Sequence, residues 1–291
     1  MDARSFLETA RGRIDAYLDT VLPPPEGPLQ QLAEAMRYSV LAGGKRIRPA
    51  LTMAACRAVG GDDERTLPFG AAIEMIHTYS LIHDDLPAMD DDELRRGRPT
   101  SHVVYGEAMA ILAGDALLTH ALETLLRDLE PSTVCRQAAY ELTHAAGAHG
   151  MVAGQVEDMA VTDAAPDEET LMRVQGGKTA ALLRAACRGG AIIGGGTPEQ
   201  IEALGRYGTH LGYAFQMVDD VLDVTSTAEI LGKTPGKDAE EHKMTWVALE
   251  GVDATRERAE RHVAWALEAA QGLEGEELLI ALAHFMTQRV R

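Results

Sequence analysis

Two clusters of aspartates have a spacing that could hold a hard metal cation. The first spans residues 83–92, reads His-Asp-Asp-Leu-Pro-Ala-Met-Asp-Asp-Asp and includes Asp84, Asp85 and Asp90. It lies at the expected end of a helix, where the helix macrodipole disfavours negative charge, and its carboxylates repel one another. The cluster therefore costs stability unless a cation offsets it, the alternative being a solvated acidic turn. A calcium loop is a poor fit, because the segment lacks the glycine and the glutamate that such a loop requires.

The second cluster spans residues 215–223 and reads Phe-Gln-Met-Val-Asp-Asp-Val-Leu-Asp inside an otherwise apolar helix. Asp219 and Asp223 are about one turn apart and share a helical face, while Asp220 is offset by about a quarter turn. Unpaired charges among Leu, Val and Phe are strongly disfavoured. Magnesium takes one or two carboxylates together with waters and substrate phosphates, which matches two sparse clusters on two helices. The two clusters therefore predict a magnesium cradle for a phosphorylated substrate.

Short clusters of basic residues occur in a chain whose net charge is −18. Residues 43–49, Gly-Gly-Lys-Arg-Ile-Arg-Pro, combine glycines with three cations at a helix start, where free N–H groups favour phosphate. Arg95 and Arg96 follow the first aspartate cluster, and an arginine fork suits diphosphate oxygens. Residues 176–179, Gly-Gly-Lys-Thr, resemble the end of a nucleotide-binding P-loop. Neither a strand nor the full glycine spacing precedes them, so we reject nucleotide binding.

The elements that must position these residues are helices. Hydrophobic residues make up 46% of the 291 residues and aromatic ones only 4%, a mix that favours helices over sheets. Apolar periodicity and helix breakers predict helices at about 2–21, 29–41, from Pro49 onward, 66–90, 107–128, 132–160, 168–187 and 198–225, then three short C-terminal helices. Residues 93–106 and 227–243 are expected to be loops, without a convincing strand or repeat. We therefore expect an all-α fold with a single domain over residues 1–291.

Composition also limits the partners and the compartment. An excess of 45 acidic over 27 basic residues repels nucleic-acid phosphates. Cys56, Cys135 and Cys187 are odd in number and lie in apolar helical patterns, so we expect buried thiols in a reducing cytoplasm. The N-terminus has no signal-peptide core, and no segment reaches the ~18 apolar residues of a membrane span. Neither zinc-type histidine spacing nor a GxSxG motif offers rival chemistry.

Taken together, these motifs resemble those of the polyprenyl diphosphate synthases. Residues 74–87, followed by Asp90 and residues 95–97, are similar to the first aspartate-rich motif of the family, and residues 219–223 to the second. The first motif is closest to that of bacterial farnesyl diphosphate synthases. The remaining motifs fall in the expected order: residues 43–49, Lys178-Thr179, Phe215-Gln216, Lys233 and Lys243. The likeness spans residues 30–250. It implies a helical bundle around a deep apolar cavity, a prenyltransferase that joins isopentenyl diphosphate to an allylic diphosphate, and a homodimer.

The resemblance also implies a role for each of these residues. Three magnesium ions on the allylic diphosphate would be held by Asp84, Asp85, Asp90, Asp219 and Asp223, with Asp220 as a supporting ligand. The same diphosphate would be assisted by Arg95, Lys178, Thr179, Gln216, Lys233 and Lys243. Isopentenyl diphosphate would be bound by Lys45, Arg48, His77 and Arg96, with Arg289 or Arg291 closing over it.

The product length is expected to depend on Tyr79. It lies five residues before Asp84, about 7.5 Å along a helix, and its ring could form a cavity floor that Ser80 is too small to provide. We therefore expect fifteen-carbon farnesyl diphosphate, made from dimethylallyl and geranyl diphosphate. Tyr79 as an ordinary core aromatic, and a geranylgeranyl or other product length, remain alternatives. A terpene cyclase would not need the basic 43–49 segment, and a catalytically silent partner subunit would be expected to lose acids or bases that this chain retains.

Three short segments depart from the family pattern. Val174-Gln175-Gly176-Gly177 stands where many relatives have Ile-His and a bulkier residue, and Ala180 stands where glycine is common. After Lys243, Met244-Thr245-Trp246-Val247 replaces a frequent Thr-Tyr-Pro pattern. None of these departures removes a charged group assigned above.

Overall fold

The computed structural model describes residues 2–161, 165, 167–225 and 243–287, and the expectation of an all-α fold is confirmed. The helices are α1 (Ala3–Val21), α2 (Gln30–Val40), α3 (Ile47–Arg57), α4 (Leu67–Asp84), α5 (Ser101–Tyr105), α6 (Glu107–Asp128), α7 (Ser132–Ala146), α8 (Met151–Ala160), α9 (Glu168–Gln175), α10 (Ala181–Ile193), α11 (Pro198–Thr225), α14 (Trp246–Glu250), α15 (Val252–Ala270) and α16 (Glu276–Thr287). Short 3₁₀ turns, η1 (Gly27–Leu29) and η2 (Asp63–Thr66), precede α2 and α4, and a π-helical turn, η3 (Gly176–Ala180), joins α9 to α10.

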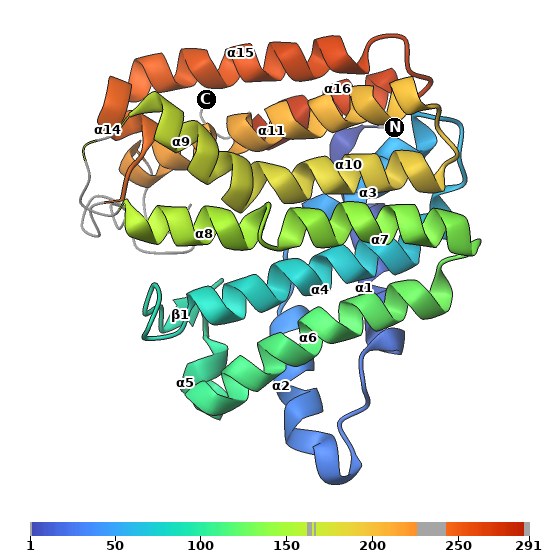
Figure 1. The fold of residues 1–291 in the computed structure, drawn as a ribbon, viewed down its shortest axis with the longest axis vertical. Coiled ribbons are helices and arrows are strands. Elements are labelled where there is room, and N and C mark those ends of the chain that lie inside the picture. The colour runs from blue at the N-terminus through green and yellow to red at the C-terminus, as the bar shows by residue number, and fades with distance from the viewer. Residues whose placement is uncertain (1, 162–164, 166, 226–242, 288–291) are drawn as a thin grey trace.

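The long helices run side by side, with α4 in the interior next to α6, and α10 and α11 stacked beyond α7 and α8 (Figure 1). Residues 68–76 of α4 are all buried, which explains why this helix lacks a polar face. Glycine permits the close packing around it: a Cβ on Gly190 of α10 would lie 2.1 Å from the carbonyl oxygen of Thr52 on α3. The helix carrying the first aspartate cluster is thus held from several sides.

Three expected helices have different bounds in the structure. The expected 66–90 helix ends at Asp84, because Pro87 restricts the residue before it and cannot continue the helical hydrogen bonding. The expected 132–160 helix breaks into α7 and α8 at Gly147–Gly150, where a Cβ on Gly150 would lie 2.0 Å from the carbonyl oxygen of Ala145. The expected 168–187 helix is interrupted by η3 and then continues as α10 to Ile193.

The expected loop at 93–106 contains a small hairpin and a short helix. Strand β1 (Leu94–Arg95) pairs antiparallel with β2 (Arg98–Pro99), and α5 follows directly. Arg96 and Gly97, at the tip, have positive φ angles of 54° and 74°, the conformation that two-residue hairpin turns require. The hairpin therefore fixes the backbone positions of Arg95 and Arg96.

The expectations of buried cysteines and of no membrane span can be compared with the helices. The three cysteines are free and buried, as expected. Among the described residues one helix, α6, is long and apolar enough by length and composition to cross a membrane, which the sequence analysis did not anticipate. This helix packs against α4 and α2, so its composition is weak evidence for a membrane span.

Candidate active site

The first aspartate cluster lies where α4 ends and a tight loop begins. Asp84 is the last residue of α4, and its carbonyl oxygen accepts a hydrogen bond from the Asp90 N–H at 2.8 Å, which folds the loop back onto the helix end. Burial raises the pKa of Asp84 to about 6, with a further rise from Asp90 and an opposing effect of Lys178. An ionised carboxylate is therefore costly here, as the sequence analysis argued, and a cation would offset the cost.

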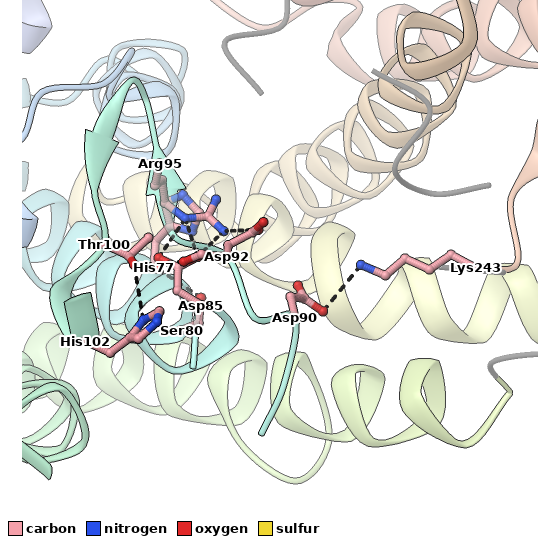
Figure 2. A network of polar contacts seen from close by, with 9 residues as sticks. All are labelled: His77, Ser80, Asp85, Asp90, Asp92, Arg95, Thr100, His102 and Lys243. Atoms are coloured by element: carbon pink, nitrogen blue, oxygen red, sulfur yellow. Dashed lines mark hydrogen bonds and ion pairs between the residues drawn. The ribbon is translucent and has the colours of Figure 1, made fainter. Parts of the chain in front are cut away.

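The carboxylate of Asp85 is hydrogen-bonded to Arg95. Arg95 Nε donates to Asp85 Oδ2 at 3.0 Å, and Nη2 donates to Asp85 Oδ1 at 2.5 Å (Figure 2). Asp92 lies 3.6 Å from the same guanidinium. Burial raises the pKa of Asp85, and the hydrogen bond from Arg95 opposes that rise. This bidentate pair ties the end of α4 to strand β1, which fixes the hairpin beside the aspartate loop.

The basic 43–49 segment lines a cavity of about 300 Å³ together with residues of α4 and the hairpin. Lys45 is exposed, whereas Arg48 and His77 are partly buried, and Arg96 reaches across to donate to the carbonyl oxygen of Gly43. Burial and the neighbouring Arg48 and Arg96 lower the pKa of His77 well below its ordinary value. Four of the residues assigned to one diphosphate thus line a single cationic pocket, with His77 as a neutral hydrogen-bonding group.

Arg46 and Glu74, which the sequence analysis left without a role, form the buried base of this pocket. Arg46 is only 2% exposed and has a left-handed backbone with φ 49°. Its guanidinium donates to Glu74 Oε1 at 2.8 Å, to Asp15 Oδ1 at 2.8 Å and to the carbonyl oxygen of Val40 at 2.6 Å. A buried arginine with such partners is structural, and its turn presents Lys45 and Arg48 to the cavity.

A second cavity of about 570 Å³ adjoins the cationic pocket, because Arg48 and His77 line both. Its walls are mainly apolar, and Asp84 and Lys178 also line it. Tyr79 and Ser80, the expected chain-length residues, both line this cavity, and the Tyr79 ring packs edge-on against His83 at 5.7 Å between centroids. Gln155 of α8 also lines it, and its Oε1 is buried without a hydrogen-bond partner among the described residues. Neither Gln155 nor its neighbour Asp158 was singled out from the sequence.

The π-helical turn η3 presents Lys178 to the cavity. A π-turn inserts a residue into the helical repeat, and such turns occur often at functional sites. Lys178 Nζ lies 2.7 Å from Asp158 Oδ2 of α8, and Thr179 Oγ1 donates to Gln216 Oε1 of α11 at 3.1 Å. The two glycines that looked like a P-loop fragment allow this approach, since a Cβ on Gly177 would lie 2.9 Å from the carbonyl oxygen of Gly150.

The second aspartate cluster is more buried than the first. Asp220 and Asp223 are 3% and 2% exposed, and Asp219 is partly buried. Asp220 accepts hydrogen bonds from Gln216 Nε2 at 3.0 Å, from the Trp246 N–H at 3.0 Å and from Gln175 Nε2 at 3.3 Å. Asp220 therefore links α11 to two other segments, a connection that sequence spacing alone does not reveal.

Lys243 reaches the first cluster from the segment that follows the second. Its Nζ lies 3.3 Å from Asp90 Oδ1 (Figure 2). Together with the bond from the Trp246 N–H to Asp220, this contact connects the two aspartate clusters through residues 243–246. Lys233, Arg289 and Arg291, which the sequence analysis also assigned, lie outside the described residues.

The donor chemistry of the site fits magnesium. Within the described ranges no three histidine, cysteine or acidic side chains converge on one point, so a cage made entirely of protein ligands is not formed there. Magnesium suits such a site, because it is usually held by one or two carboxylates together with waters and substrate phosphates. The raised pKa of Asp84 shows where a divalent cation would relieve an existing cost.

Comparisons with known proteins agree with this geometry. Residues 29–276 match the family described as polyprenyl synthetase. The chain is 49% identical to "Geranylgeranyl pyrophosphate synthase 12, chloroplastic" of Arabidopsis thaliana over 99% of its own length and 82% of the relative's. Seven further plant relatives, 44–48% identical, also have geranylgeranyl pyrophosphate synthase names.

Solved structures similar to this chain are also prenyl diphosphate synthases or prenyltransferases by name. An FPP/GFPP synthase from Zymomonas mobilis is 36% identical, with a TM-score of 0.87 and 98% of each chain covered. A geranyltransferase from Helicobacter pylori, complexed with magnesium and isoprenyl diphosphate, is 32% identical, with a TM-score of 0.88 and 98% and 97% coverage. With a family match over most of its length and relatives of this identity, the chain belongs to the polyprenyl synthetase family and is a prenyltransferase.

Proposed function

We propose that the protein condenses isopentenyl diphosphate with allylic diphosphates, and that the main product is the twenty-carbon geranylgeranyl diphosphate. The observation that carries the condensation is the pair of adjoining cavities, one cationic and one mainly apolar, which share Arg48 and His77. Such a pair suits two diphosphate substrates of which one has a growing apolar chain. A cyclase, which handles a single diphosphate, has no use for the first cavity.

The cationic pocket is proposed to bind isopentenyl diphosphate through Lys45, Arg48, His77 and Arg96. The allylic diphosphate would lie at the mouth of the larger cavity, near Asp84 and Lys178, assisted by Arg95, Thr179, Gln216, Lys233 and Lys243. We propose Asp84, Asp90, Asp219 and Asp223 as magnesium ligands, for three ions in total. Asp85, expected as a further ligand, is engaged by Arg95 and positions that arginine in our proposal.

The proposed chemistry follows from charge and exclusion of water. The carbon–oxygen bond of the allylic diphosphate breaks, and its electron pair leaves with the diphosphate. Bound magnesium would supply positive charge that neutralises this leaving group. Lys178 adds charge at the same place, while the apolar walls keep water from the allylic cation. The double bond of isopentenyl diphosphate then supplies the electrons of the new carbon–carbon bond, and a proton is lost to the departed diphosphate.

The proposed product length differs from the expectation drawn from the sequence. The farnesyl expectation rested on Tyr79 as a floor, whereas the geranylgeranyl names of the plant relatives favour the alternative. In this proposal a twenty-carbon chain extends past Tyr79. In the structure Tyr79 shares the cavity wall with Ser80 and Met151, so we propose that Tyr79 is a wall residue.

A second copy of the chain is proposed to cover the open side of the larger cavity. Val156 and Met159 of α8 and Ile111 of α6 line the cavity yet are 63%, 50% and 44% exposed. Leu112 of α6, 55% exposed, continues this apolar face. Leu112→Glu should turn a dimer into a monomer in light scattering, whereas Leu29→Glu, at a 66% exposed leucine on η1, should not. A wild-type monomer would contradict the dimer.

The compartment is proposed to be the cytoplasm. Three free, buried thiols fit a reducing environment. The plant relatives are named chloroplastic, and the proposal for this chain does not adopt that compartment.

Incubation with labelled isopentenyl diphosphate and, in turn, dimethylallyl, geranyl and farnesyl diphosphate tests the function. We expect geranylgeranyl diphosphate from all three starters, with the same product length in Tyr79→Ala. A wild type that stops at farnesyl diphosphate, with Tyr79→Ala extending to twenty carbons, would restore Tyr79 as the floor. Absence of any condensation would overturn the proposed function.

A further inference from the structure

Two of the places where the sequence departs from the family pattern, Gln175 and Trp246, contact each other in the structure. The indole Nε1 of Trp246 donates to Gln175 Oε1 at 2.6 Å, although the residues are 71 positions apart. Gln175 in turn donates through Nε2 to Asp220 Oδ2 at 3.3 Å. The backbone N–H of Trp246 donates to the same Asp220 oxygen at 3.0 Å. The three residues therefore form a closed triangle of hydrogen bonds.

The triangle is enclosed in the protein. Gln175, Asp220 and Trp246 are 6%, 3% and 0% exposed. The guanidinium of Arg258 covers the indole at 4.3 Å from the ring centroid and is itself held by Glu250. A buried amide or carboxylate that loses a partner retains its desolvation cost, so the geometry of such a cluster is narrowly defined.

Each corner of the triangle adjoins a residue of the proposed site. Gln175 is the last residue of α9, directly before the π-turn with Lys178 and Thr179. Trp246 begins α14, three positions after Lys243, whose Nζ lies against Asp90. Asp220 lies between Asp219 and Asp223 on α11. A single buried cluster thus fixes three segments that are distant in sequence and that all reach the allylic diphosphate position.

Two further hydrogen bonds, both made by Gln216, join the triangle to the cavity wall. Gln216 Nε2 donates to Asp220 Oδ1 at 3.0 Å, and Gln216 Oε1 accepts from Thr179 Oγ1 at 3.1 Å. The path from the indole of Trp246 to the hydroxyl of Thr179 is therefore a chain of direct hydrogen bonds. Displacement of the indole would be transmitted to the π-turn on one side and to the second aspartate cluster on the other.

We propose that Gln175 and Trp246 are paired positioning residues, which set the second aspartate cluster and the Lys178 turn through Asp220 for the binding of the magnesium–diphosphate group. The inference rests on the proposed function of the site. It gives the two departures from the family pattern one shared role. It also assigns Asp220 to positioning, where the sequence analysis expected a supporting metal ligand.

The test compares Trp246→Phe, Gln175→Leu and the double variant with Tyr207→Phe as the matched control. Trp246→Phe removes the indole donor together with part of the buried ring volume, and Gln175→Leu removes both amide bonds at similar volume. Tyr207→Phe removes another fully buried hydrogen bond of α11, from Tyr207 Oη to the carbonyl oxygen of Leu279 at 2.8 Å, far along the helix from the aspartates. Calorimetry measures the affinity for inorganic pyrophosphate with magnesium at saturating isopentenyl diphosphate, and separately the affinity for isopentenyl diphosphate.

We expect Trp246→Phe and Gln175→Leu to weaken pyrophosphate binding by about three- to tenfold, the size of one or two buried hydrogen bonds. The double variant should lose less than the product of the single losses, because the two residues act through one bond. Affinity for isopentenyl diphosphate should stay within about twofold of wild type, and Tyr207→Phe should lower only the melting temperature.

A melting temperature that falls while both affinities of the folded variants equal those of wild type would reduce the triangle to a structural role and overturn the proposal. Multiplicative losses in the double variant would contradict the pairing. A wild type that binds neither probe would instead overturn the proposed function of the site, so the two failures are distinguishable.

Discussion

The carboxyl group of Asp84 has an electrostatic environment that works against its own ionisation. It lies at the C-terminal end of α4, where the helix dipole is negative, and burial raises its pKa to about 6. Lys178 is the cation that most opposes this rise. At neutral pH the group is ionised at a cost in folding stability, a pattern typical of residues retained for function.

Asp84→Asn should lower turnover by about a thousandfold, since metal-ion stabilisation of a leaving group is worth several kcal/mol. The melting temperature should stay equal or rise, because the substitution removes a buried negative charge. Asp219→Ala should show the same loss of turnover. Glu93→Gln, an exposed acid in the same loop, is the control and should keep wild-type activity. Wild-type turnover by Asp84→Asn or Asp219→Ala in excess magnesium would exclude the two-cluster cradle.

Lys45 and Lys178 should separate the two substrate sites kinetically. Of these two cavities, Lys45 lines the cationic pocket and Lys178 lines the larger one. Lys45→Ala should therefore raise the KM for isopentenyl diphosphate by about tenfold, with little change in kcat. Lys178→Ala should lower kcat with the allylic substrate, because it removes a positive charge that stabilises the leaving diphosphate mainly in the transition state. The reverse pattern in steady-state kinetics would exchange the two assignments.

At the scale of elements, the packing of α11 against α15 includes a pair of histidines in contact. His210 Nδ1 and His262 Nδ1 lie 3.3 Å apart, and His262 also packs against Trp265 at 5.0 Å between ring centroids. Burial, with His210 and nearby arginines, lowers the pKa of His262 to about 4. The unfolded chain takes up this proton near the ordinary value of about 6.5, before the folded chain does.

Stability should therefore fall as pH drops from about 6.5 toward 4, by on the order of 3 kcal/mol for this residue alone. The contribution is fully present above the unfolded pKa and is lost toward the folded one. Urea unfolding at pH 7.5, 6 and 5 measures this slope, and His262→Gln, which keeps a polar side chain of similar volume without the titration, should flatten it. Equal slopes in wild type and variant would remove His262 as the cause.

The junction of α8 with η3 should be sensitive to a single methyl group. A Cβ on Gly154 would lie 2.2 Å from the backbone nitrogen of Lys178. Gly154→Ala should push the π-turn away from α8 and lower kcat about tenfold or more, because small misplacements of catalytic groups cost large factors in rate. Gly12→Ala, on α1 with nothing within 4 Å, should be active and slightly more stable. An active Gly154→Ala would show that the turn position is not critical.

Element boundaries show what the sequence could predict and where it failed. The helices predicted at about 107–128 and 198–225 agree with α6 and α11 over the described residues, since Gly106 precedes the first and Pro198 opens the second. The π-turn was not predictable, because its cause is the tertiary contact of Gly177 with Gly150 and Gly154. For the same reason Asp158 could not be identified from the sequence as the partner of Lys178.

At the scale of the whole molecule, the family and the order of its motifs were readable from the sequence, whereas the connections between motifs were not. Arg46 lies between two residues with assigned roles, yet its own charge is buried against Glu74 and Asp15. Asp220 has the same residue type as its neighbours but faces Gln175 and Trp246. Residue type and spacing identify charged groups, and only packing decides which of them face the substrate.

Inorganic pyrophosphate released per isopentenyl diphosphate consumed tests the central claim of two-substrate prenyl transfer most directly. With geranyl or farnesyl diphosphate and magnesium, the account predicts one pyrophosphate for each isopentenyl unit incorporated. Without magnesium it predicts neither pyrophosphate release nor incorporation. With the allylic diphosphate alone, release should fall to a small fraction of that rate. Equally fast release without isopentenyl diphosphate, with a cyclic or hydrolysed product, would contradict the account.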